Sequence, residues 1–239
     1  MIPPTEPTEE RVAIITGASR GIGAGLVRAY RERGYAVIAA ARSIATSEDP
    51  GVVTVEGDIA DPDTARRIVS EAIERYGRID TLINNAGIYI GKPFTDYTLE
   101  DFNALIAVNL AGFFHITTRT IEHMLDRGSG HVVNVSTTLV ERANSSTPAA
   151  LSVLTKGGLV AATKSLAIEY ASRGLRVNAV SLGVIRTHDD SSYAAMGALH
   201  PLGRVGEIGD VVGGVLCLES APFVTGEILH IDGGQSAGH

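Results

Sequence analysis

Thr16-Gly-Ala-Ser-Arg-Gly-Ile-Gly23 is the most informative segment of the sequence. It follows a short apolar run and opens a segment with the apolar spacing of a helix, Gly21–Arg33. Glycines here let the backbone turn tightly and approach a pyrophosphate, whose negative charge the free N–H groups at the helix start stabilise. The alternative is that these glycines serve packing and turns alone. Their position between a first strand and a first helix favours a dinucleotide site at Gly17, Gly21 and Gly23.

Outward from this segment, short apolar runs alternate with longer segments of helical periodicity, with no linker or internal repeat between them. Runs that are apolar throughout are typical of strands buried on both faces. The alternation predicts an α/β fold, a doubly wound parallel sheet in one domain, with ligands at the carboxyl ends of the strands. The predicted strands are Val12–Thr16, Ala36–Ala41, Val52–Glu56, Thr81–Asn84, Val132–Val135, Val177–Ser181 and Ile228–Ile231. The predicted helices are Gly21–Arg33, Pro62–Tyr76, Leu99–Arg127, Pro148–Ser172, with Thr147 and Pro148 as cap and first turn, and Glu207–Glu219.

The composition sets the limits of the protein class. The chain has 239 residues, of which 44% are hydrophobic and 20% charged, which indicates a folded globular protein. We expect a flexible tail over residues 1–10, which are rich in proline and glutamate, and a single domain over residues 11–239. The net charge of −7, with no concentrated basic stretch, argues against a nucleic-acid partner. No uncharged apolar run approaches the roughly 20 residues of a membrane span.

Cysteine and histidine usage bears on compartment and metal chemistry. The one cysteine, Cys217, lies in an apolar stretch and is predicted to be a buried thiol, which fits a reducing cytoplasm. The seven histidines are scattered and form no His-Glu-x-x-His pattern, so no metal site is expected. Ser152 and Lys156 are separated by three residues, one more than the Ser-x-x-Lys motif of hydrolases has, which argues against a hydrolase.

The chain after the tail resembles the short-chain dehydrogenases/reductases. The resemblance rests on the glycine segment, Asp58, Asn84-Asn85-Ala86-Gly87, Asn109, Lys156 and the Val224-Thr-Gly226…Asp232-Gly-Gly234 ending. It implies a Rossmann-type fold, a nicotinamide cofactor, and a dimer or tetramer formed through the long helices. It also implies that Asp58 lies near the adenine, and that the segment from Ser181 to Thr187 clamps the carboxamide although Leu182 replaces the usual proline. The cofactor residues implied by the resemblance are Gly17, Ser19, Arg20, Gly21, Ile22, Gly23, Arg42, Asp58, Ile59, Asn85, Ala86, Gly87, Lys156, Val184 and Thr187.

The end of the second predicted strand bears on the choice of cofactor. A carboxylate there would bind the ribose hydroxyls of NAD, but the sequence reads Ala39-Ala-Ala-Arg-Ser43. Arg42, with Arg20 from the glycine segment, can form charge-assisted hydrogen bonds to a 2′-phosphate, which favours NADP(H). The alternative is that both arginines are ordinary surface charges, in which case NAD(H) is used.

The catalytic pattern of the family is Tyr-x-x-x-Lys, in which a tyrosine phenol exchanges the proton at the substrate oxygen. Here Lys156 is present, but Ser152 stands at the tyrosine position. A phenol has a pKa near 10, whereas an aliphatic hydroxyl is closer to water's roughly 15.7, a proton-transfer penalty of about 7–8 kcal/mol. Ser152 is therefore a poor replacement for the phenol, although residues four apart share a helix face.

Three further positions complete the predicted catalytic set. Thr137 takes the place of the family's substrate-binding serine, although Ser136 is the alternative for the inward-facing hydroxyl. Both can instead cap local backbone. Asn109 is implied to organise a water chain from Lys156, and its alternative is to satisfy a buried backbone group.

The sequence thus predicts an NADP(H)-dependent oxidoreductase acting on a small carbonyl or alcohol with a non-standard proton donor. Three sources of the proton are open: a water held by Ser152, a tyrosine from elsewhere such as Tyr89 or Tyr193 in the substrate lid, or an acidic group on the substrate. The alternative function is a catalytically silent nucleotide-binding sensor or partner subunit.

Overall fold

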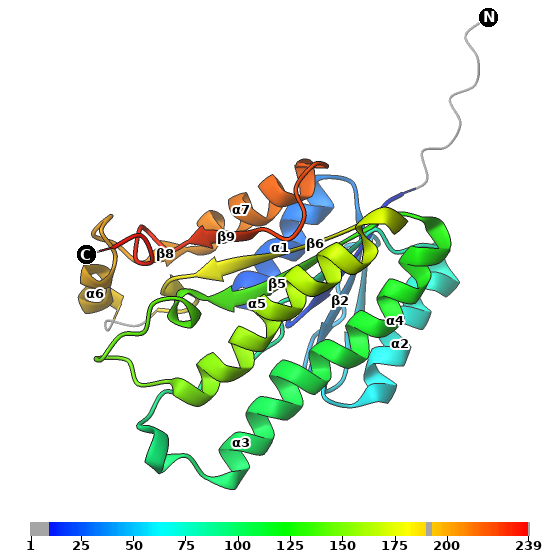
Figure 1. Cartoon of the computed structure of the whole chain (residues 1–239). Helices are drawn as coiled ribbons and strands as arrows, with labels where there is room; N and C mark the ends of the chain where they lie inside the picture. The colour runs from blue at the N-terminus through cyan, green and yellow to red at the C-terminus, as the bar shows by residue number, and fades with distance from the viewer. Residues whose placement is uncertain (1–9, 190–192, 239) are drawn as a thin grey trace, which may run out of the picture.

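Seven parallel strands form one sheet in the order β3-β2-β1-β4-β5-β6-β9 in the computed structural model, which describes residues 10–189 and 193–238 (Figure 1). The strand order reverses between β1 and β4, and the loops that leave their carboxyl ends diverge there to open a crevice. The strands are β1 (Val12–Thr16), β2 (Ala36–Ala41), β3 (Val52–Glu56), β4 (Thr81–Asn84), β5 (Gly130–Thr137), β6 (Leu175–Leu182) and β9 (Ile228–Ile231), and a separate parallel pair is made of β7 (Ile185–Arg186) and β8 (Gly206–Glu207).

Helices cover both faces of the sheet (Figure 1). One face carries α1 (Gly21–Glu32) and α7 (Ile208–Ser220), and the other carries α2 (Pro62–Tyr76), α4 (Gly112–Arg127) and α5 (Ala150–Tyr170). The predicted single-domain Rossmann-type fold is confirmed. Short elements complete the chain: α3 (Leu99–Leu105), α6 (Tyr193–Met196) and the short turns η1 (Phe94–Asp96), η2 (Ile106–Ala111), η3 (Thr138–Val140), η4 (Ala171–Arg173) and η5 (Gly197–Leu199).

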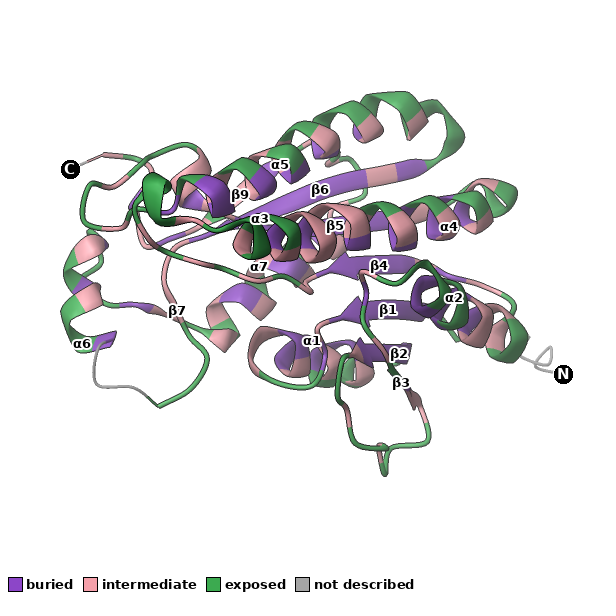
Figure 2. Ribbon diagram, turned by 90° about the horizontal axis from the view of Figure 1, so that it is seen from below, coloured by how far each residue is buried: buried purple, intermediate pink, exposed green. Residues whose placement is uncertain are grey.

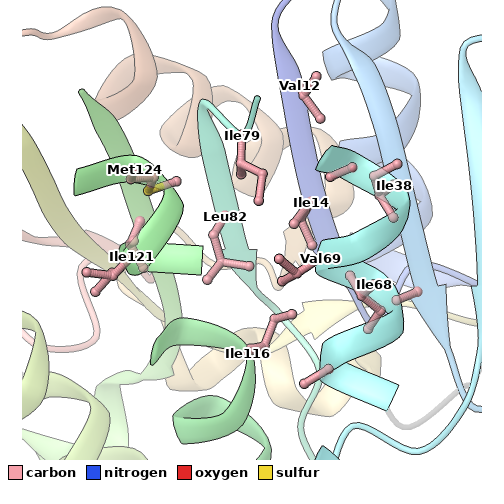
Figure 3. Packing of buried hydrophobic residues seen from close by; sticks show 14 of the residues in the cluster. Val12, Ile14, Ile38, Ile68, Val69, Ile79, Leu82, Ile116, Ile121 and Met124 are labelled. Carbon is pink, nitrogen blue, oxygen red and sulfur yellow. The ribbon is translucent and has the colours of Figure 1, made fainter. Parts of the chain in front are cut away.

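The uniformly apolar strands supply both halves of the core. Along β1, Val12 and Ile14 pack into the cluster under α2 and α4, whereas Ala13 and Ile15 pack into the cluster under α1 and α7. Figure 3 shows the first of these clusters, in which Ile68 of α2 and Ile116 of α4 meet side chains of the sheet. The central strands are buried along most of their length (Figure 2), as expected for a parallel sheet covered on both faces.

Local signals place the ends of α2 where the sequence predicts them. The Asp61 side chain accepts a hydrogen bond from the Asp63 N–H, and Pro62 occupies the first turn. Gly77 ends the helix with a φ of 67°, a left-handed conformation that favours glycine.

The predicted helix Leu99–Arg127 is continuous but not uniform. α3 passes into the π-helical turn η2 and then into α4, and Asn109 lies within that turn. By length and mean hydropathy alone (1.3 and 1.2), Leu99–Arg127 and Ala150–Arg173 are both long and apolar enough to cross a bilayer. In this fold both helices lie along the sheet, and 39% and 33% of their apolar windows are buried inside the protein.

Two sequence predictions are wrong. α5 begins at Ala150 with Ala149 as its cap, because the Thr147 N–H bonds to the Asn144 carbonyl and so belongs to the preceding turn. Cys217 is exposed rather than buried, because the buried side of α7 is the one that carries Val211 and Val215. The expected flexible tail, apart from Glu10, and lid residues 190–192 lie outside the described residues.

A buried polar network lies at the end of the sheet where the strands begin. The Glu219 carboxylate, at the end of α7, accepts hydrogen bonds from the hydroxyls of Tyr30, Tyr35 and Thr81 at 3.0–3.1 Å. Its fourth partner is Nδ1 of His131 at 2.8 Å. Side chains from α1, β4, β5 and α7 therefore meet on one carboxylate.

Candidate active site

A cavity of about 480 Å³ lies at the carboxyl ends of β1, β2 and β4, where the strand order reverses. Two predicted cofactor residues, Lys156 and Val184, do not line it. Val184 instead donates its N–H to Nε2 of His200 and borders a separate cavity of about 270 Å³. The structure brings together the other thirteen predicted cofactor residues around the larger cavity: Gly17, Ser19, Arg20, Gly21, Ile22, Gly23, Arg42, Asp58, Ile59, Asn85, Ala86, Gly87 and Thr187.

The glycine turn is shaped to receive an anion. Gly17 and Gly21 adopt φ values of 65° and 56°, which other residues rarely adopt, and a Cβ on Gly23 would lie 2.1 Å from the Gly17 carbonyl oxygen. α1 begins with no side-chain cap hydrogen bond and no acidic residue in its first turn. Its first N–H groups are therefore available to a pyrophosphate.

Thr16 ties this turn to the loop that follows β4. Its hydroxyl accepts hydrogen bonds from the N–H groups of Asn85 and Ala86 and donates to the Ile83 carbonyl. The Asn85 side chain returns hydrogen bonds to the carbonyls of Thr16 and Gly17 at 2.9 and 3.2 Å. The sequence analysis did not single out the Thr16 side chain, because its partners lie 67–70 residues away.

Two arginines stand at the far end of the cavity. Arg42 follows β2, Arg20 precedes α1, and both are exposed. Within residues 10–189 and 193–238, neither guanidinium has a hydrogen-bond or ion-pair partner. Asp58 borders the same cavity, and one of its carboxylate oxygens accepts from the Ala60 N–H. The positive charge of Arg20 and Arg42 is therefore free to meet an anionic ligand.

A second cavity of about 200 Å³ adjoins the first and shares Ile22, Asn85 and Gly87 with it. It is formed by the loop after β4, the end of β5 and the first turns of α5. Four of the five predicted catalytic residues line it, namely Ser136, Thr137, Ser152 and Lys156.

Lys156 brings an ammonium group to this second cavity, and no other described residue that lines the cavity is a lysine. Its Nζ donates to the Val135 carbonyl oxygen at 2.8 Å, and burial lowers its pKa from 10.5 to about 8. Room for it depends on Gly87, where an added Cβ would lie 2.8 Å from Nζ. Among residues 10–189 and 193–238, none that lines this cavity carries a carboxylate.

Ser152 is held by backbone. Its Oγ donates to the Ile90 carbonyl oxygen and accepts from the Ile90 N–H, both at 2.9 Å, and the residue is only 2% exposed. The hydroxyl of Tyr97 also donates to the Ile90 carbonyl. Ser152 thus fixes the loop after β4 against α5, a role that the sequence analysis did not foresee.

Asn109 fixes the same loop two residues earlier. Its Oδ1 accepts from the Ile88 N–H at 2.9 Å, and its Nδ2 donates to the Ile88 carbonyl and to Thr155 at 3.0 Å. Asn109 is buried and does not line the second cavity. The predicted alternative, in which Asn109 satisfies buried backbone, matches these contacts.

The two hydroxyls at the end of β5 are partly engaged. Ser136 donates to the Lys156 carbonyl at 3.3 Å, and Thr137 accepts from the Leu139 N–H at 3.4 Å. Both residues line the second cavity, so either hydroxyl can meet a substrate oxygen there.

The two tyrosines considered as proton donors lie in different places. Tyr89 lines the second cavity, and burial raises its pKa. Its hydroxyl is folded back beside Gly91, where an added Cβ would lie 2.8 Å away. Tyr193 is buried at the start of α6 and does not line that cavity, and its hydroxyl accepts from the Thr187 N–H at 3.4 Å.

No group of three or more His, Cys, Asp or Glu side chains is placed to hold a metal ion in the part of the chain that the structure describes.

Comparisons with known proteins agree with this architecture. Residues 17–236 match the family described as "Enoyl-(Acyl carrier protein) reductase". L-fucose dehydrogenase of Bos taurus is 35% identical over 96% of this chain and 90% of its own length. The structure of ElxO with NADP bound gives a TM-score of 0.89 at 27% identity, covering 96% of this chain and all of that one. A 3-ketoacyl-(acyl-carrier-protein) reductase from Brucella melitensis complexed with NADH gives 0.89 at 29%, covering 95% and 99%. The chain belongs to the short-chain dehydrogenase/reductase family of oxidoreductases.

Proposed function

We propose that this protein is an NADP(H)-dependent oxidoreductase that acts on a small carbonyl or alcohol without a tyrosine phenol as proton donor. The observation that carries the proposal is the pair of adjoining cavities, one formed by the glycine turn and the other containing Lys156. When bound, the nicotinamide supplies or accepts a hydride. The chain's own residues hold the nucleotide, orient the substrate oxygen at Ser136 or Thr137, and exchange a proton.

The choice of NADP(H) over NAD(H) rests on Arg20 and Arg42. Both stand unpaired beside the cavity, and no acidic residue follows β2 to bind ribose hydroxyls. ElxO is described with NADP and the Brucella melitensis reductase with NADH, so both cofactors occur among similar folds. We infer that this chain prefers NADP(H) and that NAD(H) is possible.

Replacing Arg42 by alanine is expected to weaken NADPH binding about 10- to 100-fold and to change NADH binding by less than about threefold. The reason is that only the 2′-phosphate loses a charge-assisted partner, worth about 1.5–3 kcal/mol. Calorimetric titration with each nucleotide measures both. Arg28→Ala, on the exposed side of α1, is the matched control and should leave both affinities unchanged. Wild-type protein that binds NADH more tightly than NADPH contradicts the inference.

Turnover tests the oxidoreductase proposal itself. The expected result is consumption of NADPH with at least one member of a panel made of trifluoroacetophenone, 4-nitrobenzaldehyde and menadione. The competing candidate is a silent nucleotide-binding sensor or partner subunit, and it is favoured by one observation: the Ser152 hydroxyl donates its one hydrogen to the Ile90 carbonyl. Tight NADPH binding with no consumption on any substrate supports that candidate.

We also infer a homodimer or homotetramer formed through the long helices. The outer sides of α4 and α5 leave Phe114, Leu154 and Ile168 exposed, an apolar surface that a second copy can cover. Light scattering tests the assembly.

Location and partner class follow from the sequence. The single cysteine supports a cytoplasmic location. The net charge of −7 supports a small-molecule rather than a nucleic-acid partner. We infer that residues 11–239 form the dinucleotide-binding short-chain dehydrogenase/reductase domain.

A further inference from the structure

We propose that the ammonium group of Lys156 is itself the proton donor to the substrate oxygen. This inference rests on the proposed function and deepens it. Three observations in the second cavity carry it: the other candidate donors are engaged or turned away, Lys156 reaches the cavity without a carboxylate partner, and its surroundings favour loss of a proton.

The first step concerns the hydroxyl at the tyrosine position. The one hydrogen of the Ser152 hydroxyl is donated to the Ile90 carbonyl, and the Ile90 N–H occupies a lone pair of the same oxygen. A proton given to substrate from Ser152 would break the bond that holds the loop. Ser152 is therefore a positioning residue, and a water held on the remaining lone pair of its oxygen would be a much weaker acid than an ammonium group, with a pKa of roughly 15.7 in bulk water.

The second step concerns the remaining groups. The hydroxyl of Tyr193, at the start of α6, lies outside the cavity, and the Tyr89 hydroxyl is directed to Gly91. Ser136 and Thr137 are aliphatic hydroxyls, which are weak acids. The groups facing Lys156 are the Val135 carbonyl, Ser136 and Thr137 of β5, Ser152 of α5, and Asn85, Gly87 and Tyr89 of the loop after β4. Tyr89 is the only other titratable group among these described cavity residues.

The third step concerns the Lys156 ammonium itself. Among the described residues its one hydrogen-bond partner is the Val135 carbonyl at 2.8 Å, which leaves two of its N–H groups for ligands. Because burial without a compensating negative charge disfavours the ammonium form, its pKa falls to about 8. An acid in this range is well matched to proton transfer near neutral pH.

The reaction balances with this donor. The carbonyl carbon gains a hydride, with its electron pair, from the reduced nicotinamide, and the C–O π electrons move to the oxygen. That oxygen takes a proton from Nζ, which gives the alcohol, the oxidised nicotinamide and a neutral lysine amine. Solvent then returns a proton to the amine. In the direction of alcohol oxidation, the neutral amine accepts the proton.

The first test reads the ammonium directly, without cofactor. The sequence has three lysines, Lys92, Lys156 and Lys164, so protein labelled with 13C at lysine Cε gives three signals. We expect one signal to titrate near pH 8 and to be missing from Lys156→Arg. Lys164 is exposed on α5 and serves as the reference in the same spectrum. Titration of Lys156 together with Lys164 would overturn the proposal.

The second test uses the holoenzyme with NADPH and trifluoroacetophenone. Reduction needs the ammonium form of Lys156, so kcat should fall tenfold per pH unit above the pH at which this group is half deprotonated. The same fall should be absent in Lys156→Arg. Lys156→Ala should lose about 10²- to 10⁴-fold in kcat and recover with added primary amines, to an extent that depends on amine pKa. Lys164→Ala is the matched control and should behave as wild type.

The outcomes separate the two proposals. If Lys156→Ala retains its kcat, or if rescue does not vary with the pKa of the added amine, the donor role of Lys156 is overturned. The oxidoreductase proposal still holds in that case, provided that the wild-type protein consumes NADPH. A pH midpoint removed by Tyr89→Phe but not by Lys156→Arg assigns the proton to the phenol instead and also overturns it. A wild-type protein that binds NADPH and reduces no carbonyl overturns the proposed function, and the donor role with it.

Discussion

Replacing Ser152 by tyrosine is expected to destabilise the protein rather than to increase its reductase activity. The Ile90 N–H and carbonyl both lie 2.9 Å from the Ser152 oxygen, in a site where the residue is 2% exposed. A phenol ring has to displace this segment and break both bonds. We expect Ser152→Tyr to lower the free energy of unfolding by about 2–4 kcal/mol and Tm by roughly 5–15 °C.

Denaturant and thermal unfolding measure the effect of Ser152→Tyr, and NADPH consumption measures its activity. Ser165→Tyr places the same side chain at an exposed position of α5 and should unfold like wild type. Ser152→Ala removes the two bonds without adding bulk and should cost about 1–2 kcal/mol. A Ser152→Tyr protein that is as stable as wild type and reduces carbonyls faster contradicts the contacts described for Ile90.

Removing the carboxylate of Glu219 is expected to have the largest effect on stability. Glu219→Ala leaves the hydroxyls of Tyr30, Tyr35 and Thr81 and the ring of His131 without their shared partner. Loss of one member of a buried network of this kind costs about 3–5 kcal/mol. Urea unfolding measures it, with Glu122→Ala on the exposed side of α4 as the control. A loss below about 1 kcal/mol would show that the network contributes little net stability.

The same network predicts a loss of stability in acid. Burial alone raises the pKa of Glu219, but the hydrogen bonds from His131, Tyr35 and Tyr30 outweigh it and hold this pKa at about 2, against 4.5 for the free side chain. A carboxyl whose pKa is depressed on folding contributes stability above pH 4.5, and that contribution is lost as the pH falls towards 2. The contribution is of the order of 3 kcal/mol.

His131 acts in the same direction at higher pH. Burial lowers its pKa, and its Nε2 meets Asn178 Nδ2, a donor whose orientation is fixed by the Val224 carbonyl and the Glu227 N–H. The folded protein therefore keeps His131 neutral, while the unfolded chain takes up a proton at about pH 6.5. The free energy of unfolding should begin to decrease below about pH 6.5. In Glu219→Ala the further decrease below about pH 4.5 should be absent. A wild-type Tm that stays constant from pH 7 to 4 would contradict this assignment.

The sequence predicts the elements of this fold well where local chemistry defines them. The ends of α2 are set by residues with strong local preferences: Asp61 as cap, Pro62 in the first turn and Gly77 at the end. Both ends of this helix are therefore predicted to the residue. Apolar runs likewise predict the seven strands of the sheet, although β5 and β6 extend beyond their predicted ends. Thr147 and Cys217 are mispredicted because neighbouring turns and the rotation of a helix decide their surroundings.

The candidate site is predictable only in part. The glycine turn and Arg42 lie next to a strand end and can be found from spacing. The contacts of Ser152 with Ile90 and of Asn109 with Ile88 join residues 62 and 21 positions apart through side chain and backbone, and no local pattern encodes them. The family resemblance predicts a tyrosine where Ser152 stands, but only the folded chain gives the backbone atoms that contact this position.

The hydroxyl of Thr16 has a consequence for how the protein meets its nucleotide. By joining the loops after β1 and β4, it makes the two walls of the crevice a single stiff frame before any ligand arrives. Little chain entropy then remains to be lost when the nucleotide docks, so a larger share of each new contact is retained as affinity. Because these two loops present the same contacts to NAD(H) and NADP(H), selectivity between the two nucleotides is decided by the exposed residues around the adenosine.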